Sequence, residues 1–408
     1  MIHDPAASIL TDAAGDRAVR AALAARSVQE LFGSRALGIP GTWLGAVAFP
    51  APPRTSMTWH YWWQAHLLDA LVDAALREAA SGGDPELSRR RAHQLLRGMA
   101  LRSGGAVVLN DFYDDMAWLM LALGRLRDLD RVCGAEGPDV LRAGRLLLAQ
   151  LRSAHTEDMG GGMYWNRDRT YKNTATTGPG ALIAARTSSD DSSARLLGWL
   201  REHLWDDQRG VLLDGVKLLA AGSGKETVQR DDAVYSYNSG PVLTACLELA
   251  AALPRERAEP WLEWAEQIID GADAQFGRDS RAESGAQRRT LCTHGGGDAG
   301  LFTGILARHL AQAAEDDQLP ERARAAARRL VLDTADALWD GRREFDPGLD
   351  PHDPNARPEP RRVRAIFSSD PLQPADRTHR VGAPVDLSTQ VQAWTVLEAA
   401  ARLERSIR

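Results

Sequence analysis

The sequence feature that most constrains the fold is a sixfold alternation of short polar segments with long amphipathic stretches. Segments rich in Gly, Tyr, Asn or Asp precede every second predicted helix at intervals of roughly 60 residues, with a longer last interval. A helical hairpin of that length cannot bury its apolar face alone, so neighbouring hairpins must stack around a shared core. The six segments are residues 41–43, 110–115, 171–173, 235–240, 295–298 and 382–386.

Helical periodicity covers most of the chain. Apolar residues recur at i, i+3, i+4 and i+7, and Ala, Leu, Arg and Glu are abundant. When helix ends are placed at Gly, Pro, Asn and Asp, the pattern predicts about twelve helices. They span residues 16–32, 57–78, 87–102, 113–129, 140–154, 173–186, 192–205, 238–253, 260–276, 298–314, 320–339 and 386–404.

Closing six hairpins into a ring places all six polar segments at one end. We therefore predict an all-α fold, an (α/α)6 toroid or barrel in which alternate helices line the centre, forming a single domain over residues 1–408. Open solenoids of the TPR type are the structural alternative. Their repeats are shorter, about 34 to 47 residues, and their signatures are absent here.

The connections carry weaker signals. Two short β-hairpins are predicted, one over residues 161–165 and one with its turn at Asp214 and Gly215. Residues 277–297 and 341–384 are predicted to be long and irregular, and such loops either cover a site or lack order. Within the second, residues 363–367 are expected to form a short strand near the cleft.

Composition excludes several classes of protein. The chain has 49 Lys and Arg against 55 Asp and Glu, a net charge of -6, which gives nucleic acid no attraction. No run of 18 apolar residues is present and the N-terminal region lacks a secretory apolar core, so neither a membrane partner nor secretion is expected. Three cysteines without metal-ligand spacing fit a reduced, cytoplasmic setting.

Two adjacent aspartates stand where a polar loop enters a helix that has to be buried. Asp114 and Asp115 lie at the start of the predicted helix 113–129. Helix capping explains one aspartate. A neighbouring pair carries the cost of repulsion and desolvation, which capping does not explain.

Hydrolysis of a glycoside uses such a pair. The two carboxyl groups stand about 5 to 5.5 Å apart in retaining enzymes and about 6.5 to 9.5 Å apart in inverting ones, and adjacent residues fit the shorter separation more easily. Repulsion raises the pKa of one carboxyl, so that it stays protonated as the acid while the other remains ionised. From the chemistry alone, catalysis and a structural role are equally open for Asp114 and Asp115.

The aspartate pair also carries a resemblance to a known family. Residues 113–118, Tyr-Asp-Asp-Met-Ala-Trp, resemble the paired-aspartate motif of glycoside hydrolase family 76, the α-1,6-mannanases. Residues 161–166, 171–174 and 236–240 are similar to further motifs of that family, in the same order. Another block is formed by Asp298 with Phe302, Gly304, Ile305 and Arg308.

The resemblance implies an (α/α)6 barrel and a retaining mechanism without a cofactor. It implies Asp114 as the nucleophile and Asp115 as the acid/base, acting on α-mannosides, with α-1,6-linked manno-oligosaccharides or mannan as the expected substrate. Thr303 and Ser239 depart from the Lys and Gln of the family pattern. A cytoplasmic member is expected to meet short oligosaccharides instead of cell-wall polymer.

Candidate substrate-binding residues surround this pair in the predicted toroid. Trp43, Trp59 and Trp165 are placed to stack on sugar faces, and core packing is an equally open interpretation for each. For the polar candidates, helix capping or a solvated position competes with recognition of sugar hydroxyls, and recognition is favoured at Asn173, Tyr237 and Asn238. The polar candidates are Asn110, Tyr113, Lys172, Asn173, Asp231, Asp232, Tyr237, Asn238 and Asp298.

Two other functions stay open at this point. A sugar epimerase or isomerase on the same toroid would use histidines as proton-transfer bases, and the chain offers His60, His294, His309 and His379. A noncatalytic α-mannoside-binding protein would keep the cleft without turnover. No HExxH motif or paired-cysteine spacing is present, so no metal or other cofactor is expected. The oligomeric state is left open.

Overall fold

The computed structural model describes residues 16–52, 58–187, 190–219, 227–282, 284–349 and 359–405. Within these ranges the chain forms thirteen α-helices, of which all but α12 are long. The helices are α1 (Arg17–Phe32), α2 (Tyr61–Ala80), α3 (Glu86–Arg102), α4 (Tyr113–Val132), α5 (Pro138–Ala154), α6 (Thr174–Thr187), α7 (Asp190–His203), α8 (Ser236–Ala252), α9 (Arg255–Phe276), α10 (Phe302–Ala313), α11 (Glu321–Asp340), α12 (Ala375–Thr378) and α13 (Leu387–Arg405).

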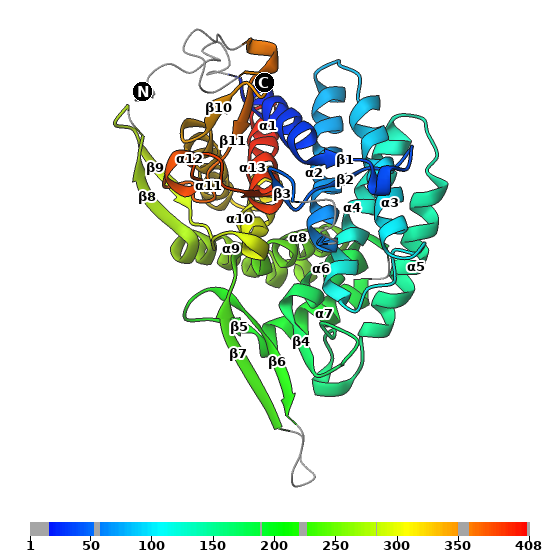
Figure 1. Ribbon diagram of the computed structural model, residues 1–408. Coiled ribbons are helices and arrows are strands. Elements are labelled where there is room, and N and C mark those ends of the chain that lie inside the picture. The colour runs from blue at the N-terminus through cyan, green and yellow to red at the C-terminus, as the bar shows by residue number, and fades with distance from the viewer. Residues whose placement is uncertain are drawn as a thin grey trace.

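Six of the long helices form a closed inner ring. Helix α2 packs on α4, α4 on α6, α6 on α8, α8 on α10, α10 on α13, and α13 returns to α2. Each of α3, α5, α7, α9 and α11 packs outside the inner helix that precedes it, and α1 packs on α13. The predicted (α/α)6 toroid is confirmed, and its sixth helix pair joins the two ends of the chain (Figure 1).

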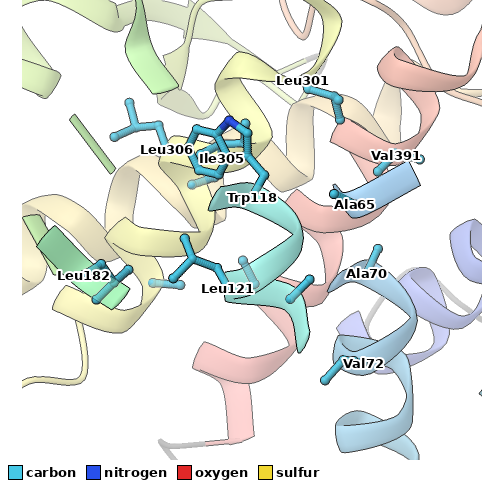
Figure 2. Packing of buried hydrophobic residues seen from close by; sticks show 14 of the residues in the cluster. Ala65, Ala70, Val72, Trp118, Leu121, Leu182, Leu301, Ile305, Leu306 and Val391 are labelled. Atoms are coloured by element: carbon cyan, nitrogen blue, oxygen red, sulfur yellow. The ribbon is translucent and has the colours of Figure 1, made fainter. Parts of the chain in front are cut away.

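Burial follows this two-layer arrangement. The outer helix α5 is amphipathic and buries Val140, Ala143, Leu147 and Leu151 at spacings of three and four residues, whereas α2 buries every residue from 67 to 72 because neighbours cover it on all sides. Figure 2 shows buried side chains from α2, α4, α6, α10 and α13 gathered in the core of the ring.

Buried ion pairs also connect three of the inner helices, α2, α4 and α10. Asp69 and Asp73, one turn apart on α2, both accept from Arg125 of α4. Arg308 of α10 binds the same two carboxylates, at 2.9 Å to Asp69 and 2.6 Å to Asp73. The two carboxylates and the two guanidinium groups balance each other in charge, so this network at the centre of the toroid has no net charge.

Short antiparallel strands lie in the connections, and the β6/β7 hairpin projects away from the helical body (Figure 1). The pairs are β1 (Gly33–Ser34) with β2 (Leu44–Gly45), β3 (Ala48–Phe49) with β12 (Val385–Asp386), β8 (Gly277–Arg281) with β9 (Gln287–Leu291), and β10 (Arg343–Phe345) with β11 (Arg364–Ile366). The remaining sheet contains β4 (Tyr171–Asn173), β5 (Trp205–Asp206), β6 (Val211–Leu219) and β7 (Thr227–Val234).

Both predicted hairpins were wrong in detail. Residues 161–165 form isolated bridges, His155 with Met163 and Tyr164 with Lys172, instead of a hairpin. Strand β6 runs straight through the predicted turn, with an irregularity in its register between Leu213 and Gly215. Glycine is needed there because a Cβ on residue 215 would lie 2.6 Å from the neighbouring tyrosine ring of β4.

The two segments expected to be irregular contain regular structure. Residues 277–297 hold the β8/β9 hairpin, and residues 341–384 hold β10, β11 and α12, while residues 350–358 lie outside the described part. The strand expected within 363–367 is confirmed as β11, but it packs on β10 and α1. None of the described residues of either segment lines the cleft discussed below. No helix in the described ranges is long and apolar enough to cross a bilayer.

Candidate active site

A cleft of about 640 Å³ opens at the end of the toroid where the inner helices begin. Segments that lead into α2, α4, α6, α8 and α10 line it. Of the six polar segments of the sequence, residues 110–115, 171–173, 235–240 and 295–298 contribute to the lining, and residues 41–43 and 382–386 do not. Its lining residues are Trp59, His60, Tyr61, Trp62, Leu109, Asn110, Asp111, Phe112, Asp114, Asp115, Trp118, Trp165, Tyr171, Asn173, Asp214, Asp231, Tyr237, Asp298 and Phe302.

Asp114 and Asp115 lie side by side in the first turn of α4 and are partly exposed to the cleft. Their hydrogen bonds differ. Asp114 accepts from the backbone N–H of Asp115 at Oδ1 (2.9 Å) and from the indole Nε1–H of Trp165 at Oδ2 (3.0 Å). Asp115 accepts at Oδ2 from the side-chain amide of Asn110 (2.8 Å). Both oxygens of Asp114 are therefore oriented by donors.

The surroundings raise the pKa of both carboxyls. Burial, followed by the charge of Asp115, raises the pKa of Asp114 well above its usual range, and the two N–H donors act in the opposite direction. Burial raises the pKa of Asp115 to about 7, with Asn110 lowering it and Asp298 raising it. N–H donors stabilise the ionised form. Asp114 accepts from two such donors and Asp115 from one, so the hydrogen bonds favour the charge on Asp114 and the proton on Asp115 when the pair shares one proton.

A third carboxylate, Asp214 of β6, faces this pair. It accepts hydrogen bonds from the Tyr171 hydroxyl (2.6 Å) and from the side-chain amide of Asn238 (3.3 Å). Burial raises its pKa, and its charge contributes to the raised pKa of Asp114. The Asp-Gly pair at residues 214 and 215 predicted a turn, because this dipeptide is a turn signal. The apolar residues that continue on both sides of the Asp-Gly pair would have indicated an unbroken strand.

A fourth carboxylate of the cleft is that of Asp298, whose charge acts on Asp115. Its Oδ1 accepts from the indole N–H groups of Trp62 (3.0 Å) and Trp63 (2.8 Å), and the His60 ring lies 3.9 Å away. The side chain of Asp298 is 64% exposed. Its negative charge is one cause of the raised pKa of Asp115.

Aromatic rings form much of the remaining wall. Tyr237 and Phe302 lie 4.2 Å apart between ring centroids, and Phe112 and Trp165 lie 5.0 Å apart. Trp118, from the second turn of α4, forms part of the floor. Flat rings beside carboxylates suit a ligand with apolar faces and many hydroxyl groups, as a sugar has.

Nine of the fourteen residues predicted for the site line the cleft. Asn173 does so while its Oδ1 also accepts from the backbone N–H of Thr176 at the start of α6 (3.1 Å). The nine residues are Trp59, Asn110, Asp114, Asp115, Trp165, Asn173, Asp231, Tyr237 and Asp298.

The other five predicted residues lie outside the lining, and three of them are aromatic or exposed. Trp43 is buried beneath Arg91 of α3, because residues 41–43 pack on α3 and do not precede α2 directly. Tyr113 is buried, with its backbone N–H bonded to Trp165. Asp232 is exposed on β7 and pairs with its neighbour Arg230.

The remaining two are buried polar side chains behind the cleft wall. Asn238 lies beneath Asp214, to which it donates. Lys172 points away from the cleft and binds oxygens of residues 156–161. Their contacts with protein groups replace the predicted contacts with substrate.

Several lining residues were not predicted from the sequence. One near α2 was missed because the predicted helix began at residue 57, whereas α2 begins at Tyr61, so that His60 precedes the helix beside the predicted Trp59. The run of aromatic residues at 59–63 was the available signal. The missed residues are His60, Tyr61, Trp62, Leu109, Asp111, Phe112, Trp118, Tyr171, Asp214 and Phe302.

Among the described residues, no group of three or more His, Cys, Asp or Glu side chains is placed to hold a metal ion.

Solved structures of several bacterial proteins share the fold. The α-1,6-mannanase GH76A from Salegentibacter sp. HEL1_6 is 24% identical, with a TM-score of 0.72, over 95% of this chain and 100% of that one. The Lin0763 protein from Listeria innocua is 21% identical (TM-score 0.71; 96% and 98% covered). The family 76 mannosidase Bt3792 from Bacteroides thetaiotaomicron is 17% identical (TM-score 0.71; 96% and 100% covered).

No curated protein sequence matches the chain significantly. The model of the family described as glycosyl hydrolase family 76 matches residues 22–348, which is most of the chain and includes every residue that lines the cleft. The chain belongs to glycosyl hydrolase family 76.

Proposed function

We propose that this enzyme hydrolyses α-mannosides, in particular α-1,6-linked manno-oligosaccharides or mannan, with retention of configuration. Asp114 is the nucleophile and Asp115 the acid/base. The observation that carries the proposal is the adjacent pair of carboxyls in the cleft, one held at both oxygens by N–H donors and the other with its pKa raised to about 7.

The relatives support the choice of substrate. The Salegentibacter protein is described as an α-1,6-mannanase. Its variants with two adjacent aspartates replaced are described as inactive, in complexes with α-1,6-mannotriose and α-1,6-mannotetrose. The adjacent pair in the present cleft is Asp114 and Asp115.

In the first step of the proposed reaction, a carboxylate oxygen of Asp114 attacks the anomeric carbon. The bond from that carbon to the leaving oxygen breaks, and Asp115 gives its proton to this oxygen. In the second step, Asp115 takes a proton from water, whose oxygen attacks the same carbon and releases Asp114 as a carboxylate. The pKa of about 7 on Asp115 suits both transfers near neutral pH.

The negative charge of the cleft favours the positively charged transition state of the proposed reaction. Six aspartates line it, and no lysine or arginine is among its lining residues. Negative charge around the anomeric carbon stabilises the positive charge that develops there. The carboxylates of Asp214, Asp231 and Asp298 are also acceptors for sugar hydroxyls.

Substitution of each catalytic carboxyl tests the assignment. Asp114→Asn is expected to abolish hydrolysis of every substrate. Asp115→Asn is expected to abolish hydrolysis of oligosaccharides and retain activity on glycosides whose leaving group needs no proton, such as α-mannosyl fluoride. Equal losses on both substrate types in Asp115→Asn would contradict the separate roles.

Stereochemistry and linkage are tested on the wild-type enzyme. We expect NMR of the first-formed product from α-1,6-mannotriose to show the α-anomer, and slower hydrolysis of α-1,2- and α-1,3-linked isomers. A first-formed β-anomer would contradict retention. Binding of these sugars without hydrolysis would instead indicate a noncatalytic protein.

The arrangement of histidines disfavours epimerisation. Of His60, His294, His309 and His379, His60 lines the cleft, and the others do not. His309 is buried against Thr244, and His294 accepts from the backbone N–H of Ser236. Incubation with free mannose is expected to give no other sugar.

A further inference from the structure

Lys172 is a fully buried cation that the proposed reaction does not use. Strand β4 pairs with β6 so that Tyr171 and Asn173 line the cleft. Because side chains alternate along a strand, Lys172 between them points to the opposite side, where its exposed fraction is 0%. A buried ammonium has to be compensated by its surroundings.

The compensation comes from a cage of oxygens. The Nζ of Lys172 lies 3.0 Å from both the carbonyl oxygen and the hydroxyl of Thr156, 2.5 Å from the carbonyl oxygen of Asp158 and 2.7 Å from that of Gly161. The ring of Tyr164 lies 4.7 Å from the ammonium. Four acceptors thus converge on a group with three N–H donors.

The backbone of the cage has an unusual conformation. Met159, Gly160, Gly161 and Gly162 are consecutive residues with positive φ, at 54°, 77°, 120° and 74°. A side-chain-bearing residue such as Met159 rarely adopts this conformation. At Gly162 a Cβ would lie 2.6 Å from the ring of Trp199. This tight turn brings carbonyl groups from both of its ends toward one point.

The choice of lysine is specific to this place. Of the 49 basic residues in the chain, only Lys172, Lys217 and Lys225 are lysines. A guanidinium is a planar fork that fits carboxylates, whereas an ammonium is a compact charge that fits acceptors arranged around a point. In a sequence that mostly uses arginine, one of the three lysines lies where the cage requires an ammonium.

The cage leads directly to the catalytic pair through Trp165. The backbone N–H of Trp165 donates to the carbonyl of Tyr171, next to Lys172, at 2.8 Å. The carbonyl of Trp165 accepts from the N–H of Tyr113, next to Asp114, at 2.7 Å. Its indole N–H then donates to Asp114 itself at 3.0 Å. Trp165 is held between the lysine strand and the helix of the nucleophile.

We propose that Lys172 is a positioning residue: its ammonium closes the 156–161 loop around itself, and the closed loop holds Trp165 against the carboxylate of Asp114. The kinetic consequence rests on the proposed function. The position of Trp165 can be measured without any substrate, so a wrong substrate assignment and a wrong role for Lys172 give different results.

The cage also has a pH dependence that can be used as a readout. Burial lowers the pKa of Lys172 to about 8, although Asp158 and Glu157 act in the opposite direction. The neutral amine offers two donors and a lone pair to the surrounding oxygens, so its interactions with them weaken. The other titratable and charged groups near Lys172 are Asp158 and Arg169, which act on its pKa, and His155, whose own pKa is affected by Lys172 and by Arg195.

The experiment follows the indole N–H of Trp165 by NMR of protein labelled with 15N-tryptophan, with the resonance assigned by Trp165→Phe. In the wild type we expect this resonance to change with a midpoint near pH 8, in addition to the change that titration of Asp114 and Asp115 produces. In Lys172→Met we expect it to be displaced at about pH 6, without the transition near pH 8. The control Lys217→Met, at the exposed position opposite Tyr171 in the sheet, is expected to behave as the wild type.

Kinetics give a second readout. In Lys172→Met we expect kcat on an α-mannoside to fall about 10- to 100-fold, because a small misplacement of a catalytic group has an effect of this size, while KM changes less. In Lys217→Met both stay within about twofold of the wild type. The NMR changes without any hydrolysis of mannosides would support the role of Lys172 and contradict the proposed function.

Two results would overturn the proposal. One is an unchanged Trp165 resonance in a folded Lys172→Met protein. The other is a wild-type resonance whose pH dependence between about pH 7 and pH 9 is the same as that of Lys172→Met. If Lys172→Met does not fold, Thr156→Val decides: loss of an oxygen that stabilises the ammonium should move the midpoint to lower pH, and an unmoved midpoint overturns the proposal.

Discussion

The indole Nε1–H of Trp165 donates to Oδ2 of Asp114 across 3.0 Å, linking the bridged segment after the 156–161 loop to the first turn of α4. The backbone N–H of Asp115 holds the other oxygen of the same carboxylate. A carboxylate with both oxygens bonded cannot rotate freely, so its attack direction is fixed before substrate binds. The donors also favour its ionised form.

Loss of the indole donor should impair the nucleophile. In Trp165→Phe we expect kcat to fall about 10- to 100-fold, because a hydrogen bond to a charged group contributes roughly 1.5 to 3 kcal/mol. The acidic limb of the pH–rate profile should move to higher pH, since this donor lowers the pKa of Asp114. Trp261→Phe on the outer helix α9 is the control and should leave both quantities unchanged. An unshifted acidic limb in Trp165→Phe would contradict this role.

Asp214 should act on the nucleophile through its charge. Because that charge is one cause of the raised pKa of Asp114, we expect Asp214→Asn to move the acidic limb of kcat/KM to lower pH. Asp232→Asn, on the exposed side of the same hairpin, is the matched control and should not move it. Profiles measured between about pH 3 and pH 7 on one α-mannoside check both variants. A shift of the same size in both would assign the effect to general surface charge.

The fold was predictable because its signal is repeated. Each of the twelve amphipathic segments shows helical periodicity by itself, and the polar segments between them recur six times. An error at one helix end therefore does not change the predicted ring of helices. The one helix outside that pattern, α12, has four residues and no periodicity to detect. Closure of the ring by α13 against α2 follows from the count of hairpins and not from any local motif.

Site residues at the starts of helices could be predicted from the sequence. Residues whose position depends on the pairing of β4 with β6 could not. Asp114 and Asp115 stood out because capping explains one carboxylate and not two. Lys172 and Asn238 share the polar character of binding residues, and their sequence neighbours line the cleft. For Lys172, only the pairing of β4 with β6 shows that its side chain lies on the side away from the cleft. For Asn238, only the position of Asp214 on β6 shows that its amide is bound by a protein carboxylate. Asp214 was not predicted as a site residue because Asp-Gly signals a turn. Here the glycine of this dipeptide leaves room for the neighbouring ring of Tyr171.

The raised pKa of Asp115 predicts a trade-off between stability and activity. The folded-state value of about 7 lies above the ordinary value of 3.8, so the stability that this carboxyl contributes is present below about pH 4 and lost as the pH rises through 7. Asp115→Asn should therefore be more stable than the wild type at pH 8, by about 1 to 2 kcal/mol given its partial exposure, and similar at pH 4.

Thermal or urea unfolding at the two pH values measures this difference. Asp111→Asn, an exposed carboxyl three residues before the pair, is the control and should change stability little at either pH. A gain in Asp115→Asn that is equal at pH 4 and pH 8 would show that ionisation of the carboxyl is not its cause.

The central ion pairs should dominate the acid stability of the toroid. Burial raises the pKa of Asp73, but Arg125 and Arg308 outweigh it and lower the value to about 2. Stability from this carboxylate is thus present above about pH 4 and lost as the pH falls through 2. In Arg308→Met, Asp73 keeps one of its two cations, its pKa rises, and acid unfolding should begin at higher pH.

At neutral pH the same substitution leaves buried negative charge on α2 uncompensated, which costs roughly 3 to 5 kcal/mol when one partner of a buried pair is removed. The control is Arg131→Met, which removes an exposed pair with Asp128 whose side chains are 67% and 61% exposed, and its expected loss is below about 1 kcal/mol. Urea unfolding at pH 7 and pH 4 compares the two variants. Losses of equal size would mean that the network contributes no more than a surface pair and that apolar packing alone holds the inner ring.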